Sequence, residues 1–336
     1  MTIMNKKWTL AARPEGLPKA ADFEWRTEEL KPLEEGEIRV RNVYLSLDPA
    51  NRVWMVRDTY VPMVGLGETM RGGGIGIVEE SRNSKFAAGD TVQGLICWQT
   101  YYTGPGKGFS KVPPVGIPLA AHYGLFGHIG YTAYFGLLDI GAPKEGETLV
   151  VSAAAGAVGS LAGQIGKIKG CRVVGIAGSD EKCQWITRDL GFDAAINYKT
   201  EDLRVALKRH CPNGVDIYFE NVGAATLEAV LNRMNNFGRI PACGMVSTYN
   251  RTEPEPAPNN LFHIITKRLK MQGFIVIDYA ARFEEARAEL LRWHQEGRLQ
   301  YRLDINQGLE SAPSAFRKLF DGSNTGKLLV QISPET

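Results

Sequence analysis

The stretch "TLVVSAAAGAVGSLAGQIGKIKGCRVVGIAGSDEK", residues 148–182, decides the fold of this 336-residue chain. It predicts a buried strand, a turn of small residues, an amphipathic helix and a second strand, which is the order of a Rossmann unit. The three glycine positions of that unit are occupied by Ala154, Gly156 and Gly159. We expect Ala154 to be tolerated, because a methyl group fits where a turn keeps a negative φ. The helix would then direct its first N–H groups at the pyrophosphate of a dinucleotide.

The end of the second predicted strand indicates which dinucleotide would bind. An NAD site usually carries Asp or Glu there, which accepts a hydrogen bond from the ribose 2′-hydroxyl. Here Gly178 and Ser179 stand at the strand end, and we interpret Asp180 as the cap of the next helix. Lys182 lies in the first turn of that helix, where a cation is unfavourable unless an anion binds beside it. These residues favour NADP over NAD, and the alternative interpretation of Lys182 is a solvated surface lysine.

The rest of the chain extends this unit in both directions. Short apolar runs alternate with helical segments, which is typical of a doubly wound parallel sheet. These runs lie at residues 148–153, 171–178, 193–198, 215–223, 239–246 and 272–278. Before them, residues 8–119 carry short strand-like runs cut by Gly and Pro, which predict a closed or rolled sheet. After them, residues 281–300 predict an amphipathic helix that stops at Gly297, and the tail suits a strand that returns to the first domain.

Composition narrows the class of partner. The 39 basic and 37 acidic residues nearly cancel, so nothing favours nucleic acid or an anionic membrane, and a small-molecule ligand is expected. No charged and apolar leader and no long apolar run is present, which predicts a cytoplasmic protein. The five cysteines include no C-x-x-C pair and the five histidines are scattered. We therefore expect neither a disulfide framework nor a bound metal.

Eight motifs, spread over nearly the whole chain, carry a family resemblance. They are "LSLDP" (45–49), "MRGGGIG" (70–76), "GYTAYFGLLDIG" (130–141), "VVSAAAGAVGSLAGQIGKIKGC" (150–171), "GSDEK" (178–182), "YFENVG" (218–223), "CGMVSTYNRT" (243–252) and "NTGKLLV" (324–330). With them the chain resembles the zinc-independent medium-chain dehydrogenase/reductases, in the group of leukotriene B4 12-hydroxydehydrogenase, prostaglandin reductase, alkenal double-bond reductase and bacterial curcumin reductase. The resemblance implies an α/β fold, in which a Rossmann doubly wound parallel sheet accompanies a β-rich GroES-like catalytic domain. We expect the catalytic domain at residues 1–127 and 299–336, and the NADP-binding domain at residues 128–298.

The resemblance also implies an activity and a set of cofactor-binding residues. The activity is the NADPH-dependent reduction of the C=C bond in α,β-unsaturated aldehydes and ketones, by a homodimer formed through the sixth strand of the Rossmann sheet. The positions matching Gly156, Ala157, Val158 and Gly159 would hold the pyrophosphate, and those matching Lys182 and Tyr198 would contact the 2′-phosphate. The positions expected around the ribose and nicotinamide are Asn221, Cys243, Gly244, Tyr249, Phe274, Val276 and Asn324. The pattern alone would assign Tyr198 to structure and the two asparagines to turns.

Some residues depart from the family pattern. The family commonly shows "DPYMR", whereas this chain has "DPANR" with Ala50 and Asn51. Thr266 stands where plant and mammalian members often carry a tyrosine, and His128 and Ile129 replace a Met-Pro pair. These changes fall around the expected substrate pocket, so they leave the cofactor assignment in place and loosen the assignment of the substrate.

Reduction of an enone needs a hydride at the β-carbon, a proton at the α-carbon and a donor to the oxygen as it becomes an enolate. NADPH supplies the hydride, and a tyrosine hydroxyl can serve as the donor. Tyr60 matches a tyrosine that bacterial relatives place over the pocket and is the first candidate, with a packed structural tyrosine as the alternative. His128 is the second candidate, since an imidazole can donate to the oxygen or to the α-carbon. The nicotinamide ribose hydroxyl is another candidate donor to the oxygen, and solvent can provide the proton at the α-carbon. Two other functions stay open: a zinc-free quinone oxidoreductase or alcohol dehydrogenase, and a non-catalytic NADPH-binding protein.

Overall fold

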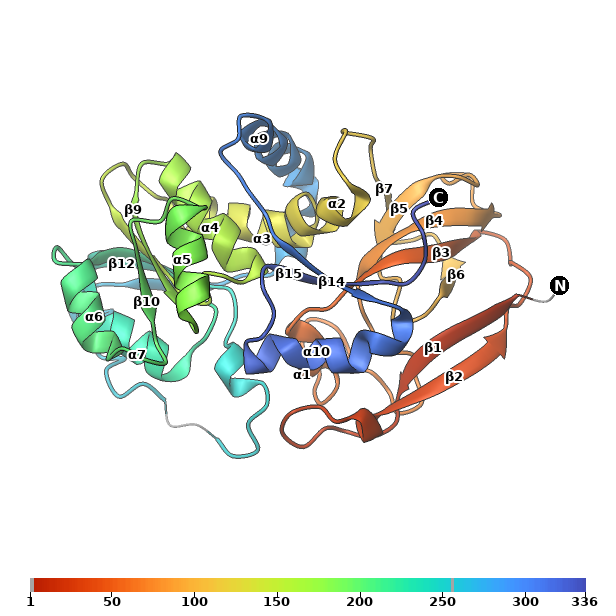
Figure 1. Ribbon diagram of the computed structural model, residues 1–336, viewed down its shortest axis with the longest axis horizontal. Coiled ribbons are helices and arrows are strands. Elements are labelled where there is room, and N and C mark those ends of the chain that lie inside the picture. Colours follow the sequence, from red (N-terminus) through yellow and green to blue (C-terminus); the bar gives the residue numbers. More distant parts are fainter. Residues whose placement is uncertain (1–2, 255–256) are drawn as a thin grey trace. The chain divides into compact units, whose positions relative to one another are not determined.

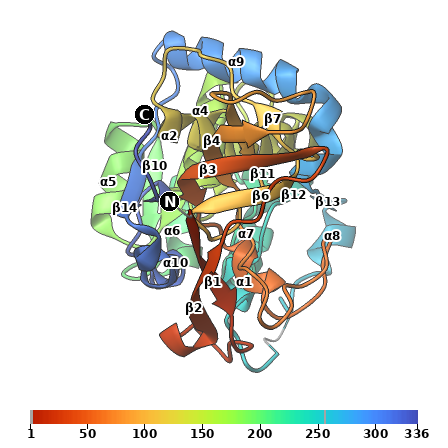
Figure 2. The ribbon, with the colours of Figure 1, turned by 90° about the vertical axis from the view of Figure 1, so that its right-hand side faces the viewer.

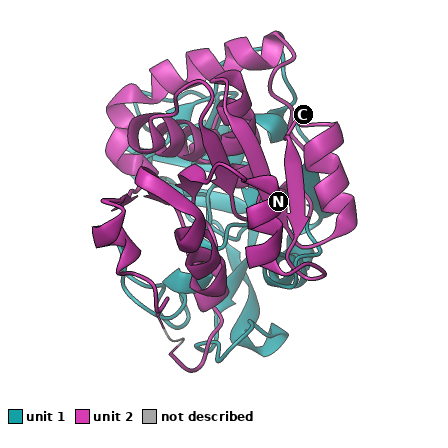
Figure 3. Cartoon of the chain, turned by 90° about the vertical axis from the view of Figure 1, so that its left-hand side faces the viewer, with its two compact units in different colours: residues 1–123, 303–324, 328–336 teal, residues 124–302, 325–327 magenta. Residues whose placement is uncertain are grey.

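The computed structural model describes residues 3–254 and 257–336 (Figure 1). The chain divides into two compact units (Figure 3). Unit 1 comprises residues 1–123, 303–324 and 328–336, and unit 2 comprises residues 124–302 and 325–327. The helix α2 (Leu119–Leu125) carries the chain from the first unit into the second.

Unit 2 is built on a six-stranded parallel sheet with the order β10-β9-β8-β11-β12-β13. The strands are β8 (Thr148–Val151), β9 (Arg172–Ala177), β10 (Ala194–Asn197), β11 (Val215–Phe219), β12 (Met234–Ala242) and β13 (Lys270–Gly273). The chain runs outward from β8 through β9 to β10, then returns to β11 and continues on the other side. This reversal between β8 and β11 is the point where open α/β sheets bind ligands, beyond the carboxyl ends of the strands. The predicted α/β fold with a doubly wound parallel sheet is confirmed.

The last two strands differ from the sequence prediction. β12 begins at Met234 rather than near residue 239, and β13 ends at Gly273, so most of the strand predicted at residues 272–278 is not strand. The cause lies in pairing: among the described residues β13 is an edge strand with β12 as its one neighbour, and the ladder ends with Ala242 opposite Gly273. Past that pair the apolar run "FIVID" meets no further strand of the described chain, and the chain turns into a short helix at Val276.

The helical segments of unit 2 precede, connect and follow these strands. They are α3 (His128–Phe135), the π-helix η2 (Gly136–Gly141), α4 (Ala157–Ile168), α5 (Asp180–Arg188), α6 (Leu203–His210), α7 (Ala224–Arg233), η3 (Val246–Thr248), α8 (His263–Thr266), η4 (Val276–Arg282) and α9 (Phe283–Gln295). The amphipathic helix predicted after the glycine turn is α4, in which Leu161 and Ile165 are buried and Ile168 is half-buried. The other predicted amphipathic helix is α9, and Gly297 stops it in the left-handed region with φ of 72°.

Unit 1 contains a sheet with the order β14-β15-β3-β4-β5-β7, in which the pairs from β15 to β7 are antiparallel, and β6 also pairs antiparallel with β3 (Figure 2). Its strands are β3 (Glu37–Ser46), β4 (Gly74–Ser81), β5 (Thr91–Gly94), β6 (Tyr101–Pro105), β7 (Ser110–Lys111), β14 (Leu303–Gln307) and β15 (Lys327–Gln331), and β1 (Met4–Leu10) pairs with β2 (Phe23–Glu29) separately. The C-terminal strand joins the N-terminal sheet, because β15 pairs antiparallel with β3. The short helices of this unit are η1 (Ala20–Asp22), α1 (Ala50–Trp54), η5 (Leu309–Ser311) and α10 (Ala312–Asp321).

The largest side chains in the core of unit 1 belong to an aromatic cluster. The Trp98 ring stacks on Phe23 and meets Phe316 of α10 edge-on, with 5.5 Å between the ring centroids in both pairs. Trp98 and Phe316 are fully buried, so α10 is held to the sheet by burial of apolar area.

The described residues also show whether a helix could span a membrane and whether the cysteines are paired. Across residues 3–254 and 257–336, each helix is too short or too polar to cross a bilayer. All five cysteines are free thiols.

Candidate functional site

The turn between β8 and α4 lies at the carboxyl edge of the parallel sheet. A Cβ atom on Gly159 would stand 2.4 Å from the carbonyl oxygen of Ala153, so only glycine lets the helix approach the strand this closely. Ala154 is buried and keeps a negative φ, as the sequence predicted. The residue that takes the left-handed conformation is Ala153, with φ of 48°, which sequence reasoning missed. A non-glycine residue in that region is strained, and such strain is common at ligand-binding turns.

The start of α4 offers donors for an anion. Gly156 is the N-cap and has no side chain to cap the helix. The N–H groups of Ala157, Val158 and Gly159 belong to the first turn and therefore have no acceptor inside the helix. A diphosphate at this point would accept hydrogen bonds from them and meet the positive end of the helix dipole.

A short segment from the C-terminal part of the chain borders this turn. Residues 325–327 belong to unit 2, and the N–H of Gly326 donates to the carbonyl of Ala155 at 3.3 Å. Gly326 has φ of 70°, and a Cβ atom there would stand 2.1 Å from the carbonyl oxygen of Arg302. Sequence reasoning did not single out this glycine, although it lies within "NTGKLLV". The expected site residue Asn324 directly precedes the segment and belongs to unit 1.

The end of β9 carries the residues expected to choose between NAD and NADP. Ser179, rather than Asp180, is the N-cap of α5, and its hydroxyl accepts from the backbone N–H of Lys182 at 3.3 Å. Asp180 is the first residue of the helix, and its carboxylate accepts from the Asn197 side chain at 2.7 Å. The prediction that Asp180 is the cap was wrong by one residue, because the serine one position earlier already has the extended backbone that a cap requires.

Tyr198 lies beside this strand end. Its side chain is 52% exposed, and its backbone N–H donates to the carbonyl of Ala177 at 3.1 Å. A Cβ atom on Gly178 would stand 3.1 Å from the Tyr198 ring, so the two residues are in contact. The structure thus places Gly178, Ser179, Lys182 and Tyr198 close together, just beyond the carboxyl ends of β9 and β10.

The loops that follow β11 and β12 lie beyond the carboxyl ends of those strands, on the other side of β8 in the sheet. The backbone N–H of Asn221 donates to Ser152 Oγ at 2.8 Å, and its side-chain amide donates to the Ser152 carbonyl at 2.7 Å. The Asn221 carbonyl accepts from the N–H of Val246 at 3.1 Å, which ties the two loops together. Tyr249 folds back on its own loop, and its hydroxyl accepts from the N–H of Met245 at 3.2 Å. Glu220, which sequence reasoning did not single out, lies directly before Asn221 and is fully buried.

Cys243 and Gly244 contribute backbone rather than side-chain chemistry. Their N–H groups donate to the carbonyl of Glu220 at 2.9 and 3.1 Å. Burial, together with the negative charge of Glu220, raises the pKa of the Cys243 thiol to about 12. The thiol is therefore neutral at physiological pH and is a poor nucleophile.

Phe274 and Val276 follow the shortened strand β13. A Cβ atom on Gly136 would stand 2.4 Å from the ring of Phe274, so this ring packs on the π-helix η2. Val276 begins η4 and is half-buried. His128 begins α3 and is half-buried, and Thr266, at the end of α8, is exposed.

In unit 1, Tyr60 lies on an exposed loop. Its side chain is 50% exposed, and its ring meets Trp54 edge-on with 6.2 Å between the centroids. The Arg71 guanidinium lies 5.6 Å from the centre of the Trp54 ring and donates to the Pro62 carbonyl at 2.6 Å. The Tyr60 ring is thus held by its contact with Trp54.

The substitution at Asn51 has a structural explanation. Asn51 is buried, accepts from the N–H of Asp48 at 2.9 Å and donates to the carbonyl of Arg71 at 3.2 Å. It therefore fixes the turn that follows β3. Ala50, the other departure in this motif, begins α1 and is half-buried.

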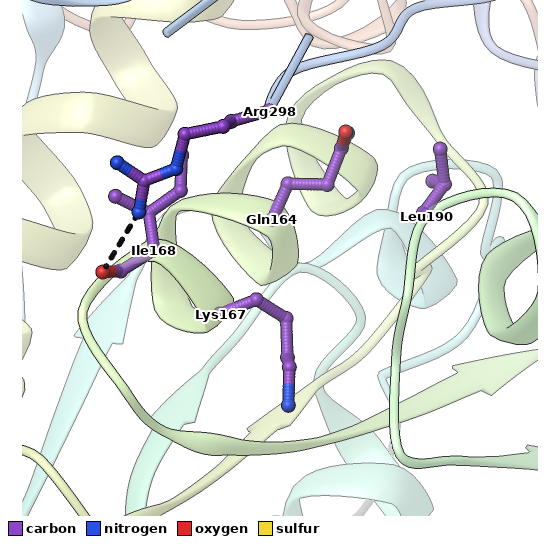
Figure 4. A pocket seen from close by; sticks show the side chains of 5 residues that line it. All are labelled: Gln164, Lys167, Ile168, Leu190 and Arg298. Atoms are coloured by element: carbon purple, nitrogen blue, oxygen red, sulfur yellow. Dashed lines mark hydrogen bonds between the residues drawn. The ribbon is translucent and has the colours of Figure 1, made fainter. Parts of the chain in front are cut away.

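Two further features of the described residues concern metal binding and a pocket outside the glycine turn. In residues 3–254 and 257–336, no group of three or more His, Cys, Asp or Glu side chains could hold a metal ion. A pocket of about 200 Å³ is lined by Gln164, Lys167, Ile168, Leu190 and Arg298, and Arg298 donates to the Ile168 carbonyl at 3.4 Å (Figure 4). It lies at the C-terminal end of α4, which is 12 residues and thus about 18 Å long, so it is separate from the glycine turn.

Similarity to known proteins covers almost the whole chain. The family model described as "N-terminal domain of oxidoreductase" matches residues 6–112, and that described as "Zinc-binding dehydrogenase" matches residues 157–293. The chain is 43% identical to the NADPH-dependent curcumin reductase of Escherichia coli (strain K12), over 98% of this chain and 97% of that protein. It is 42% identical to the NADP(+)-dependent 2-alkenal reductase of Nicotiana tabacum, over 99% of both chains. The crystal structure of CurA in complex with NADPH from Vibrio vulnificus matches with a TM-score of 0.94 and 43% identity, over 98% of this chain and 99% of that one.

Proposed function

The chain belongs to the zinc-independent medium-chain dehydrogenase/reductases, and we propose that it is an NADPH-dependent reductase of the C=C bond in α,β-unsaturated aldehydes and ketones. One observation carries the choice of cofactor. The end of β9 presents Gly178, Ser179 and Lys182 in place of an acid that would accept from a ribose 2′-hydroxyl, and the nearest acid, Asp180, is bonded to Asn197. The relatives named above are NADPH- or NADP(+)-dependent reductases.

The residues of unit 2 fit NADPH along the carboxyl edge of the sheet. We assign the first turn of α4, Gly156 to Gly159, to the pyrophosphate, because it offers backbone donors and a glycine that a Cβ atom would obstruct. The adenosine end of the site consists of residues 178–182 and Tyr198, where a lysine and a tyrosine hydroxyl can bind the 2′-phosphate. The nicotinamide end consists of Ser152, residues 221–223 and residues 243–249. We assign Phe274, Val276 and Asn324 to the surroundings of the nicotinamide as well.

The bound cofactor supplies a hydride. The substrate would take up this hydride at its β-carbon and a proton from solvent at its α-carbon, so that the C=C bond is reduced and the carbonyl is retained. Negative charge develops on the carbonyl oxygen as the hydride arrives, and a hydrogen-bond donor stabilises it there. Tyr60 is our candidate donor, because the residue is half exposed and its ring is held by Trp54. A tyrosine hydroxyl can donate such a hydrogen bond.

We propose a catalytic domain of residues 1–127 and 299–336, a cofactor domain of residues 128–298 and a homodimer. The edge strand β13 has one neighbour within the described chain. Large apolar side chains near it are more than half exposed, namely Phe237, Phe262, Ile265 and Ile277. Exposed strand edges and apolar groups favour pairing with a second copy. Ile265→Asp should therefore shift the particle mass from dimer to monomer in light scattering, and a natural chain that is monomeric would refute the dimer. A cytoplasmic location accords with five free thiols.

The activity is tested by NADPH oxidation with a panel of enals and enones, followed by tracing deuterium from labelled NADPH. The expected product is the saturated carbonyl compound with the label on its β-carbon. Label on the carbonyl carbon, or turnover of quinones or alcohols but of no enone, would overturn the proposal. Tyr60→Phe should lower kcat by about tenfold or more, since one donor to a developing oxyanion is lost.

A further inference from the structure

Glu220 is a buried acid at the carboxyl edge of the parallel sheet. It follows β11 directly, and its side chain has 0% exposure. None of the ion pairs within the described residues includes it. Acidic side chains are rarely fully buried without a cation, because taking a carboxylate out of water is costly. A glutamate at this position therefore indicates a role that an apolar side chain could not fulfil.

The hydrogen bonds of the carboxylate are all made by one oxygen. Oε1 accepts from the backbone N–H groups of Val222 at 2.6 Å and Gly223 at 3.0 Å. It also accepts from the hydroxyls of Tyr218 at 2.9 Å and Ser152 at 3.1 Å. Oε2 is buried and has no hydrogen-bond partner in the described chain. Each of the four groups that contact Oε1 can donate to it, and burial raises the pKa of the Glu220 carboxyl above its ordinary value.

The backbone of Glu220 reaches the neighbouring strand. Its N–H donates to the Pro241 carbonyl at 3.0 Å, and its carbonyl accepts from the N–H groups of Cys243 and Gly244. One residue therefore connects the end of β8, through Ser152, with the loops that follow β11 and β12. Gly223, which the side chain fixes, has φ of 84° and turns the chain into α7.

These bonds determine how Asn221 is presented. Its backbone N–H and its side-chain amide are both committed to Ser152, and its carbonyl is committed to Val246. Its Oδ1 makes no hydrogen bond within the described residues, so this oxygen is the group that can accept from a ligand. The orientation of that oxygen depends on the turn that Glu220 holds.

We propose that Glu220 is a positioning residue, whose carboxylate and carbonyl together hold the loops 221–223 and 243–249 in the conformation that receives the nicotinamide half of NADPH. The inference rests on the function proposed above. It assigns Glu220 no contact with the cofactor. Its effect passes through Asn221 and through the backbone of Cys243 and Gly244.

The proposal predicts that substitution of Glu220 weakens binding of the nicotinamide half of the cofactor and not of the adenosine half, and this difference can be measured. NADPH spans both ends of the site, whereas adenosine 2′,5′-bisphosphate occupies only the adenosine end. In Glu220→Ala the loops lose their anchor, so the affinity for NADPH should fall by about tenfold or more, the usual effect of losing hydrogen bonds to a charged group. The affinity for adenosine 2′,5′-bisphosphate should stay within about twofold, because residues 178–182 make no hydrogen bond to Glu220.

Two further variants control for stability. In Glu220→Gln the amide oxygen can still accept from Val222 and Gly223, so the loss of NADPH affinity should be smaller than in Glu220→Ala, and this variant decides the matter if the alanine variant does not fold. Gln164→Ala is the matched control. Gln164, which Figure 4 shows on α4, is also buried and holds the Gln300 backbone through two hydrogen bonds, of 2.8 and 3.0 Å, and its side-chain hydrogen bonds within the described residues go to Ser160 and Gln300 rather than to either loop. It should lower the melting temperature without changing either affinity.

The measurement is the dissociation constant of each ligand by calorimetric titration, together with thermal unfolding of each unliganded variant. Selective loss of NADPH affinity in the Glu220 variants supports the proposal. Equal loss of both ligands, or NADPH affinity that is unchanged in a folded Glu220 variant, overturns it. If the natural chain binds adenosine 2′,5′-bisphosphate and NADPH equally weakly, the proposed function fails and the inference falls with it.

Discussion

At the adenosine end of the proposed NADPH site, Gly178, Ser179 and Lys182 are neighbours in the sequence, and the serine cap holds the lysine backbone directly. At the nicotinamide end, the central contact joins Ser152 to Glu220, which lie 68 residues apart. The first end is therefore specified by local structure, namely a strand end and a helix cap. The second end exists only when β8, β11 and β12 are aligned side by side. We expect the two ends to respond differently to substitution.

The glycine turn lies between the two ends, and its substitution should damage both. In Gly159→Ala the new Cβ atom would stand 2.4 Å from a backbone oxygen of Ala153, so helix and strand must move apart. We expect a loss of about 1–3 kcal/mol in the free energy of unfolding, typical of overpacking, and weaker binding of both NADPH and adenosine 2′,5′-bisphosphate.

The matched control for this variant is Gly273→Ala, because a Cβ atom at Gly273 has no neighbour within 4 Å. It should change the free energy of unfolding by less than about 0.5 kcal/mol. Chemical denaturation measures both variants. If Gly159→Ala proved as stable as the control, the close approach of α4 to the turn would not be needed for the fold.

The adenosine end can be altered by itself with Ser179→Asp. Aspartate is as good an N-cap as serine, so α5 should be retained, while the new carboxylate repels a 2′-phosphate and can accept from a ribose 2′-hydroxyl. We expect the affinity for NADPH to fall by about tenfold and the affinity for NADH to rise, since a nearby like charge costs about 1 kcal/mol or more.

The control variant makes the reverse exchange, aspartate to serine, at the N-cap of the next helix, α6. Asp202 caps α6 and accepts from the N–H of Val205 at 2.9 Å, and Asp202→Ser should leave the preference between NADPH and NADH unchanged. Titration of both cofactors gives the ratio of affinities. A Ser179→Asp variant that kept the natural ratio would show that the 2′-phosphate binds elsewhere.

The same contrast explains what the sequence could predict. The parallel sheet and the β9–α5 junction follow from periodicity, small residues and capping chemistry, all of which are local signals. The end of β13 could not be predicted from its apolar run, because it depends on where its partner β12 ends. Asn221 was expected at the site only through resemblance, since its bonds to Ser152 join distant segments. One signal for Glu220 was present: an acid that directly follows a buried strand is unusual and indicates a buried polar contact.

The smallest effect we expect concerns two thiols, one at each end. Cys183, in the first turn of α5, has a pKa raised to about 11 by burial and by the charges of Asp180 and Glu201. The pKa of Cys243 is raised to about 12 by burial and by Glu220. Only the thiolate reacts with an alkylating agent, so both thiols should be nearly inert at neutral pH, and Cys183 should begin to react at a lower pH than Cys243.

Iodoacetamide labelling across a pH series, read by peptide mass spectrometry, measures this order. Glu220→Gln removes a negative charge beside Cys243 and should lower the pH at which Cys243 reacts, while Cys183 is unaffected. If Cys243 reacted first in the natural chain, the carboxylate of Glu220 would be protonated or displaced in solution. The nicotinamide end would then lack the anchored loops that distinguish it from the adenosine end.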